Sequence, residues 1–188
     1  RRQAFDEHGN SVWFVTRTVY DVFGRTVIST EEYPEGTSEP IRGTQTVYDQ
    51  QGRTIRSIQL AGIVVAIDTA TGNSVLTSSG SILSQNQTTW DPDGRVAFTT
   101  DEYGFETHPT YDSLGRTTET RRQSVDQNGN IVWLVSRTVY DSLGRVDVST
   151  DLYLEGSAGP IYGTRAVYDE LGRTVGTVRL EGVSISIN

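Results

Sequence analysis

Few residues in this sequence could carry catalytic chemistry. It has no cysteine and only two histidines, His8 and His108. His8 is replaced by Asn128 in a later copy of the same segment, and His108 precedes Pro109. Neither histidine has a recurring serine or aspartate partner of the kind that builds a catalytic triad. We therefore expect no enzyme activity, and we predict no catalytic and no cofactor-binding residue.

The charged residues exclude further classes of function. All 16 basic residues are arginine, so Schiff-base chemistry and the lysine of a phosphate-binding loop are excluded. The 24 acidic residues leave a formal net charge of -8, which argues against nucleic acid as a partner. The longest apolar run, residues 63–67, is too short to span a bilayer, so no membrane insertion is expected.

Calcium is the ion that the acidic turns could bind. Residues 126–130 read DQNGN and residues 91–94 read DPDG, so each offers several oxygen atoms in a short segment. Both segments lack the distal bidentate glutamate of an EF-hand, and residues 6–10 place a histidine in the corresponding turn. Calcium therefore stays an alternative, and no metal-ligating residue is predicted.

The chain repeats itself at a distance of 120 residues. Residues 1–68 align without a gap on residues 121–188, and about half of the aligned positions are identical. We interpret residues 1–120 as one complete super-repeat and residues 121–188 as a partial second one, equivalent to residues 1–68. We expect the chain to be a fragment of a longer array.

A shorter motif, aromatic-Asp-x-x-Gly-Arg, recurs within this long period. The steps between its copies are 28, 42, 21, 29 and 28 residues. Weaker copies, which keep only Asp-x-x-Gly, begin at Asp6, Asp101 and Asp126. The defining residues of the strong copies are Tyr20, Asp21, Gly24 and Arg25; Tyr48, Asp49, Gly52 and Arg53; Trp90, Asp91, Gly94 and Arg95; Tyr111, Asp112, Gly115 and Arg116; Tyr140, Asp141, Gly144 and Arg145; and Tyr168, Asp169, Gly172 and Arg173.

The motif predicts a β-hairpin turn. The aspartate side chain can accept a hydrogen bond from the backbone two residues on, and glycine supplies the positive φ that follows a type I turn. The result is a three-residue loop with a glycine bulge, closed by an Asp–Arg pair across the strands. The arginine plane can also lie over a tyrosine of a neighbouring repeat. In the first copy the expected opposite pairs are Asp21 with Arg25, Tyr20 with Thr26, and Val19 with Val27.

The segments between the turns alternate as β-strands do. Thr, Val, Ile and Tyr dominate them, and no convincing amphipathic helix is found. We predict an all-β fold of tandem antiparallel β-hairpins that form an extended repetitive sheet or sandwich, as in a solenoid or a shell. Residues 69–89 are expected to add a further hairpin. Cross-strand or core packing is the expected fate of Trp13, Tyr20 and Trp133, and stacking on glycans is the alternative.

Copies of Tyr/Trp-Asp-x-x-Gly-Arg in one register give the sequence a resemblance to a known family. It resembles the YD-repeat (RHS-repeat) proteins, which include bacterial Rhs proteins, the shell-forming B and C components of Tc toxins, and the animal teneurins. The resemblance extends over residues 6–173. It implies strips of β-hairpins that coil into a spiral sheet or hollow shell, on exported or extracellular proteins, with repeats that are not catalytic.

The sequence departs from this family in two ways. The family spacing is near 20 residues and fairly even, whereas the steps here vary within a 120-residue period. The family's Asp-Pro-x-Gly-Leu ending is not found, and residues 91–94 match only part of it inside a repeat turn.

These features lead to one main hypothesis of function and two alternatives. The main hypothesis is a non-enzymatic structural segment of a long extracellular or cell-surface protein, bacterial in origin, that builds a rigid filament or wall. The alternatives are a wall section of a toxin-encapsulating shell and a glycan-binding adhesion module. The expected partners are neighbouring repeats of the same chain or of like chains.

Overall fold

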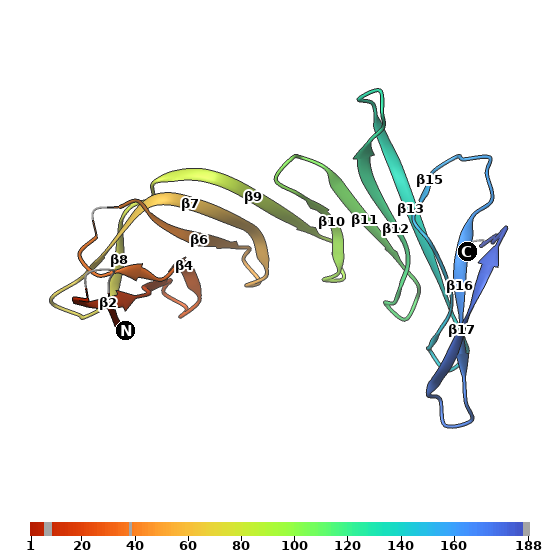
Figure 1. Cartoon of the computed structure of the whole chain (residues 1–188), viewed down its shortest axis with the longest axis horizontal. Coiled ribbons are helices and arrows are strands. Elements are labelled where there is room, and N and C mark those ends of the chain that lie inside the picture. The colour runs from red at the N-terminus through yellow and green to blue at the C-terminus, as the bar shows by residue number, and fades with distance from the viewer. Residues whose placement is uncertain (6–8, 38, 186–188) are drawn as a thin grey trace. The chain divides into compact units, whose positions relative to one another are not determined.

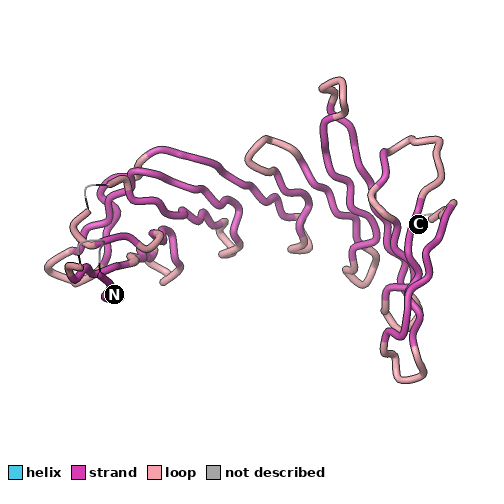
Figure 2. Tube along the Cα trace, viewed as in Figure 1, coloured by secondary structure: helices cyan, strands magenta, loops and turns pink. Residues whose placement is uncertain are grey.

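The structure is a computed structural model that describes residues 1–5, 9–37 and 39–185. It forms two compact units, unit 1 (Arg1–Thr88) and unit 2 (Thr89–Asn188), which are described separately. All regular elements of the described residues are β-strands joined by turns and loops (Figure 2), which confirms the all-β prediction. No helix in this part of the chain is long and apolar enough to cross a membrane. Asp6 and His8 lie outside the described residues.

Unit 1 contains two sheets (Figure 1). In the smaller sheet β2 pairs with β1 and β5, and in the larger one the order is β3-β4-β6-β7-β9, with β8 also paired to β7. The strands are β1 (Arg2–Phe5), β2 (Ser11–Val15), β3 (Thr18–Tyr20), β4 (Thr26–Thr30), β5 (Tyr33–Pro34), β6 (Ile41–Tyr48), β7 (Thr54–Ile67), β8 (Ser74–Ser78) and β9 (Ser81–Trp90).

Residues 69–89 do not form the separate hairpin that the sequence predicts. Strand β8 pairs with residues 64–67 of β7, and β9 pairs with residues 56–61 of the same strand. β8 and β9 therefore form the second arm of one long hairpin whose first arm is β7. The apolar residues of β8 find their partners on β7 because that strand, with 14 residues, continues past the end of its pairing with β6.

The core of unit 1 is small and lies around β7. Ile28, Ile58, Leu60, Ile63 and Val65 form its buried cluster. In β7 the buried positions alternate with exposed ones on either side of residues 61 and 62, as expected for a strand with one buried face. Partly buried side chains from β3, β6 and β8 pack against the cluster, namely Val19, Ile41, Val47 and Leu76.

Unit 2 is one antiparallel sheet in the order β10-β11-β12-β13-β14-β16-β17, with β15 also paired to β13 (Figure 1). Val135 and Val148 are its buried apolar residues among those described. The strands are β10 (Val96–Thr100), β11 (Glu106–Tyr111), β12 (Thr117–Val125), β13 (Ile131–Tyr140), β14 (Val146–Thr150), β15 (Tyr153–Leu154), β16 (Tyr162–Tyr168) and β17 (Thr174–Glu181).

The two copies of the 120-residue repeat form corresponding strands. β14 and β15 begin and end 120 residues after β4 and β5, and β17 begins 120 residues after β7. The boundary between the sequence copies, at residues 120 and 121, falls inside β12. Equivalent positions of the two sequence copies thus form equivalent strands, so the local sequence of the repeat determines where these strands lie in the chain.

Candidate functional site

The repeated turns are the main candidate site, because they carry the recurring charged residues. In all six strong copies the Asp backbone N–H donates to the Arg carbonyl at 2.8–2.9 Å, and the Gly N–H donates to the Asp carbonyl at 2.9–3.1 Å. Gly24, in the first copy, has a φ of 79°, in the left-handed region that glycine adopts readily. This is the three-residue hairpin loop with a glycine bulge that the motif predicts.

Each turn aspartate also binds through its side chain. One carboxylate oxygen of Asp112 accepts hydrogen bonds from the backbone N–H groups of Leu114 and Arg116, both at 2.9 Å. Its other oxygen accepts from Nε of Arg116 at 2.7 Å. The same Arg Nε bond is 2.7–3.0 Å long in the other copies, from Arg25 to Asp21, Arg53 to Asp49, Arg95 to Asp91, Arg145 to Asp141, and Arg173 to Asp169.

These bonds lower the pKa of the turn carboxylates. In Asp112 and Asp141 the largest influence is the hydrogen bond from the backbone N–H of the following arginine, which lowers the pKa. Partial desolvation opposes it, and the bond from the guanidinium lowers the pKa further. In Asp21 and Asp49 desolvation is the largest single influence and raises the pKa. The hydrogen bonds from the arginine and from a second backbone N–H of the turn, together with the positive charge of the arginine, nevertheless leave the pKa below its ordinary value.

The lowered pKa values predict acid sensitivity. A carboxylate whose pKa is lower in the folded state stabilises the fold fully above its unfolded pKa, about 3.9 for Asp, and this contribution is lost as the pH falls through the folded pKa. We expect the urea midpoint to stay level from about pH 7 to 5 and to fall below about pH 4. The measurement is urea unfolding of the wild type and of Asp112→Asn across this range. A difference between the two proteins that stays constant down to about pH 2 would contradict the assignment.

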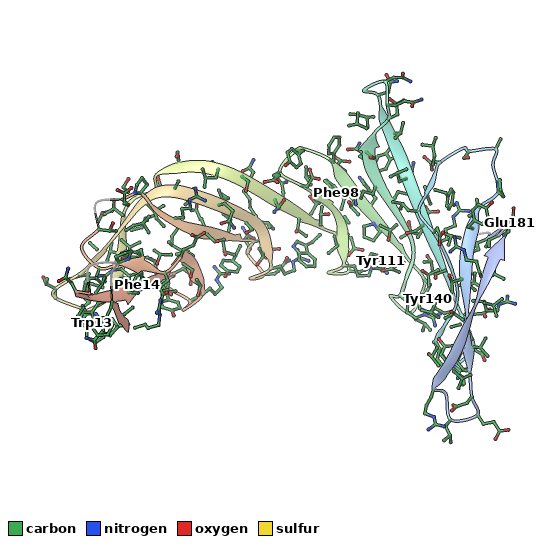
Figure 3. All side chains as sticks on the ribbon, viewed as in Figure 1. Trp13, Phe14, Phe98, Tyr111, Tyr140 and Glu181 are labelled. Carbon is green, nitrogen blue, oxygen red and sulfur yellow. The ribbon has the colours of Figure 1, made fainter. Side chains whose placement is uncertain are left out.

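In four of the strong copies the structure shows the turn arginine in contact with the next turn along the sheet. The Arg116 guanidinium lies 4.4 Å from the ring centroid of Tyr140. The hydroxyl of Tyr140 donates to the carbonyl of Thr117 at 2.9 Å, so the tyrosine is held by two neighbouring residues of the preceding turn. Figure 3 shows Tyr111 and Tyr140 near the ends of β11 and β13. The other pairs in which both contacts are formed are Arg25 with Tyr48, Arg95 with Tyr111, and Arg145 with Tyr168.

We call this arrangement, in which an arginine is bound by its own aspartate and covers the tyrosine of the next turn, the Asp–Arg–Tyr link. The link joins hairpins that are adjacent in the sheet, because β4 pairs with β6 and β14 pairs with β16. The sequence predicts the contact between arginine and tyrosine. It does not reveal the bond from the tyrosine hydroxyl to the preceding turn, because that carbonyl has no side-chain signature.

The strand register beyond each turn differs from the prediction by one residue. Tyr20 lies opposite Thr26 as expected, but Val19 lies opposite Ile28 and not Val27. Val27 is therefore the extra residue of a β-bulge. The carbonyl of Thr26, next to this bulge, accepts the hydroxyl of Tyr48 at 2.8 Å. Equivalent register shifts accompany the turns at Asp49, Asp112, Asp141 and Asp169.

The Asp–Arg–Tyr link predicts measurable energetic coupling between turns. In a double-mutant cycle of Arg116→Ala with Tyr140→Leu, we expect a coupling energy of about 0.5–1 kcal/mol, because the pair is partly exposed. Urea unfolding of the four proteins, followed by a probe in unit 2, measures it. The matched control is Leu114→Ala with Tyr140→Leu, since Leu114 at the tip of the same turn is 75% exposed. Equal coupling in both cycles would refute the link.

The weaker copies that begin at Asp101 and Asp126 form the same turn without the arginine. Asp101 accepts from the backbone of Tyr103 and Phe105, and Asp126 accepts from the backbone of Asn128 and Asn130. The second oxygen of Asp126 accepts from the Asn130 amide at 3.1 Å. Both carboxylate oxygens of Asp126, which were considered for calcium, are thus engaged in closing the turn. Among the described residues no three His, Cys, Asp or Glu side chains gather in a way that could hold a metal ion.

His108 lies in an aromatic cluster on unit 2. Its ring stacks on Phe98 at 5.0 Å between centroids and meets the edge of Trp133 at 5.4 Å. Its Nε2 lies 2.7 Å from a carboxylate oxygen of Glu106. The Arg121 guanidinium also lies over Trp133, at 4.9 Å from the ring centroid. Trp133 therefore has the cross-strand packing that the sequence predicts.

Tyr20 does not have the predicted packing, because 60% of it is exposed. The equivalent Tyr140 is covered by Arg116, which lies 24 positions before it. Trp13 is also 44% exposed. Both rings thus lie on the surface of unit 1, as the alternative hypothesis that they stack on glycans requires.

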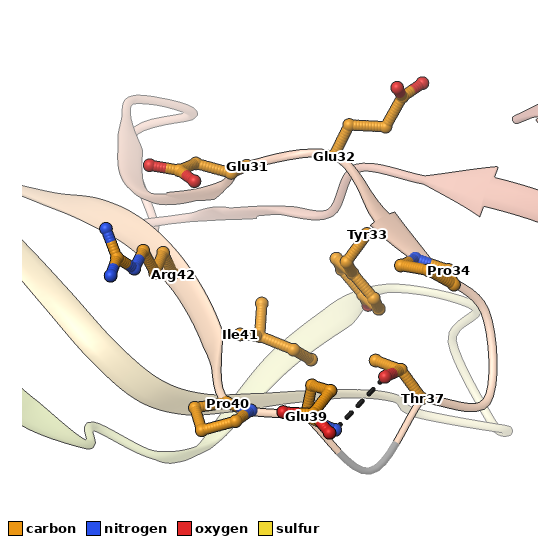
Figure 4. Close-up of a pocket in the computed structure, with 9 residues that line it drawn as sticks. All are labelled: Glu31, Glu32, Tyr33, Pro34, Thr37, Glu39, Pro40, Ile41 and Arg42. Carbon is orange, nitrogen blue, oxygen red and sulfur yellow. Dashed lines mark hydrogen bonds between the residues drawn. The ribbon is translucent and has the colours of Figure 1, made fainter.

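A hollow of about 240 Å³ lies beside β5 in unit 1 (Figure 4). Its lining includes Tyr33, Glu32 and Glu39, and the backbone N–H of Glu39 donates to the Thr37 hydroxyl at 3.1 Å. Glu32 is already bound by Arg2 at 2.8 Å. In the second copy Leu152 and Gly159 replace the two glutamates, so the acidic lining is not part of the repeat.

Comparison with known proteins gives structural neighbours alone. No family model matches the chain, and no curated protein matches it. One solved structure, "Crystal Structure of TcdB2-TccC3-Cdc42", aligns with 92% of this chain at 16% identity and a TM-score of 0.48. A second, "Crystal Structure of TcdB2-TccC3-TEV", aligns with 87% of this chain at 10% identity and a TM-score of 0.27. The chain spans 10% and 11% of the lengths of those two chains.

Proposed function

We propose that this chain is a non-enzymatic structural segment of a long extracellular YD-repeat protein, in which it builds a rigid β-rich filament or wall. The observation that carries this proposal is the Asp–Arg–Tyr link. In each strong copy the turn aspartate and arginine bind each other, and Arg25, Arg95, Arg116 and Arg145 also contact the tyrosine of the next turn. They are engaged in holding hairpins together and so are not presented to a substrate.

The link favours an array over an isolated module. Each tyrosine is fully held only when the preceding turn supplies both an arginine and a carbonyl, as for Tyr140 on Arg116 and Thr117. Stability then comes from nearest-neighbour contacts and grows with the number of repeats, as in other repeat proteins. The partners in this proposal are neighbouring repeats of the same chain or of like chains.

The composition is compatible with a durable material outside the cell. The chain has no cysteine and no methionine, the two residue types most open to oxidation. It has no lysine, so trypsin-like proteases have arginine alone as a cleavage site. Six of those arginines are bound to the aspartate of their own turn.

The test is to lengthen the array. Chains with one, two and three additional copies of residues 1–120 are expected to show rising urea midpoints, and electron microscopy is expected to show rods that lengthen with copy number. A urea midpoint independent of copy number would overturn the structural proposal. Closed hollow particles in the micrographs would replace the filament with a shell wall, and specific binding on a glycan array would favour the adhesion module.

A further inference from the structure

Three exposed leucines lie at the tips of consecutive turns in unit 2. Leu114, Leu143 and Leu171 each stand directly before the glycine of their turn and are 75–77% exposed. Their turns join β11 to β12, β13 to β14 and β16 to β17, which follow one another in the sheet. All three turns therefore lie at the same ends of the strands (Figure 1). We call Leu114, Leu143 and Leu171 the leucine row.

The exposure of this row does not depend on where the sequence begins or ends. The hairpin of Leu114 pairs with β10 on one side and with β13 on the other. The hairpin of Leu143 pairs with β12 and β16 in the same way. Both leucines are exposed although their hairpins have neighbours on both sides, because strands added at the edges of a sheet do not cover the tips of its turns.

The turn itself does not require leucine at this position. Gln51 and Asn128 occupy it in other turns, and those turns form the same backbone hydrogen bonds. A single exposed leucine is normal on a protein surface, but large apolar side chains repeated along one surface indicate a site of contact. The leucine row is therefore a candidate interaction surface.

The charges around the row suit a like surface. The turns at Asp112 and Asp141 each contain one aspartate and one arginine, which bind each other, and the third turn adds only Glu170 to such a pair. The row is thus nearly neutral in a chain whose formal net charge is -8. Two copies can approach each other there without strong like-charge repulsion, whereas an anionic partner finds no excess of positive charge.

The spacing of the row favours a second copy as the partner. Each tip belongs to a hairpin two strands wide, so neighbouring tips are about 9–10 Å apart. A leucine placed midway between two tips lies about 5 Å from each, close to the separation at which apolar side chains pack. Sheets also twist by about 20–25° from strand to strand, and a row with the same twist stays in step with this one.

Neighbouring tips leave room for such an insertion. In unit 1, Phe23 holds the position that Leu143 holds in the second copy. An open hollow of about 370 Å³ lies between Phe23 and the next turn, at Asp49, and Arg25 and Gln51 also line it. A leucine side chain of another copy is small enough to enter a hollow of this size.

We propose that the leucine row is a lateral interface at which a second copy of this chain interdigitates its own leucine row. The inference goes beyond the proposed function and rests on it only for the length of the array. The row offers roughly 300 Å² of apolar surface, about 100 Å² for each leucine, whereas a stable interface covers about 800 Å² on each partner. One chain therefore pairs weakly, and an array that repeats the row pairs firmly because its contacts form together.

The first test uses a chain long enough to pair firmly. Residues 69–188 are added twice after Asn188, which is the counterpart of Asp68, so that each added copy repeats the leucine row in register. Sedimentation velocity is expected to show pairs of this extended chain, with a dissociation constant at least about a hundredfold lower than that of the 188-residue chain. An extended chain that stays single up to about 100 μM, whether straight or closed into a particle, overturns the proposal.

Glutamine in place of the row should abolish the pairing. The variant carries, in every copy of the extended chain, Leu114→Gln, Leu143→Gln and Leu171→Gln. Its dissociation constant is expected to rise by about a hundredfold or more. Its urea midpoint should change little, since Gln51 occupies the same position in the turn at Asp49. Pairing as firm as that of the unchanged extended chain would refute the interface.

The matched control removes exposed apolar side chains from the opposite ends of the strands. Tyr103 and Ile131, in the turn between β10 and β11 and at the start of β13, are 77% and 63% exposed. The extended chain with Tyr103→Gln and Ile131→Gln in every copy should pair as the unchanged one does. An equal loss of pairing in this control would mean that general hydrophobicity, and not the leucine row, holds the copies together.

A thiol cross-link then locates the contact, because the chain contains no cysteine. Ser142→Cys in the first copy of the extended chain places one thiol beside Leu143 and leaves the row complete. A short bismaleimide is expected to link two such chains at least about tenfold faster than chains with Asn128→Cys, whose thiol lies at the opposite ends of the strands. Equal rates in the two variants would place the contact elsewhere and reject the proposal.

A lipid surface is the other apolar partner that the experiment distinguishes. Vesicles of phosphatidylcholine are sedimented with the extended chain and with its glutamine variant. We expect neither protein to sediment with the vesicles. Binding of the unchanged chain alone, in place of pairing, would assign the row to a membrane and overturn the proposal.

The results separate this inference from the proposed function. Arrays whose stability rises with copy number but which stay single would keep the structural role and reject the lateral interface. Pairing through the leucine row without any gain in stability from added repeats would keep the interface and reject the structural role.

Discussion

Replacing Ile63 with alanine is expected to lower the free energy of unfolding of unit 1 by about 2–5 kcal/mol. Ile63 is 1% exposed and belongs to the buried core cluster. The core has few fully buried side chains, so few neighbours can move in to fill the cavity that the truncated side chain leaves. The loss is the transfer free energy of the removed carbons together with the cost of that cavity.

The measurement is urea unfolding combined with amide exchange, because a chain with two units need not unfold in one step. Exchange in β6 and β7 reports on unit 1 alone. The matched control is Ile82→Ala, since Ile82 is 62% exposed and should cost no more than about 0.5 kcal/mol. If the two variants were equally stable, the core would not lie where the structure places it.

Replacing Gly163 with alanine is expected to destabilise unit 2 by about 1–3 kcal/mol, the range of an overpacked site. A Cβ at this position would lie 2.6 Å from the carbonyl oxygen of Ser149 and 3.2 Å from the Cα of Thr150. Both atoms belong to the backbone of β14, which pairs with β16 at this point. The clash can be relieved only if the two strands move apart, which weakens their hydrogen bonds.

Gly176→Ala is the matched control for this prediction. Gly176 lies in β17, and a Cβ added there would have nothing within 4 Å, so alanine meets no obstacle. By restricting the unfolded chain it should leave stability unchanged or raise it by up to about 1 kcal/mol. Urea unfolding followed by exchange in β14 and β16 distinguishes the variants. Destabilisation by Gly176→Ala as large as that by Gly163→Ala would show that close approach of β14 is not the cause.

The turns are the part of this structure that the sequence predicts best. Asp, Gly and Arg of one copy lie within five residues, and their hydrogen bonds form among themselves. These bonds do not depend on contacts with distant parts of the chain, so the same turn is found wherever the motif occurs. The all-β class follows for the same reason, from many turns between alternating segments.

The strand partners beyond the turns could not be predicted in the same way. The motif predicts Val19 opposite Val27, but a bulge places it opposite Ile28. The sequence predicts a further hairpin in residues 69–89, but β8 and β9 both pair with β7. In each case the choice depends on which distant apolar faces can be buried together, and alternating residues fit several registers about equally well.

The sequence by itself determined the repeat, the position of the turns and the pairing of each turn aspartate with its arginine, because these depend on residues close together in the chain. Only the tertiary structure decided which strands lie side by side, where the bulges fall and which tyrosine each arginine covers. These choices depend on which distant apolar faces are buried together, and residues that are close together in the chain do not specify that.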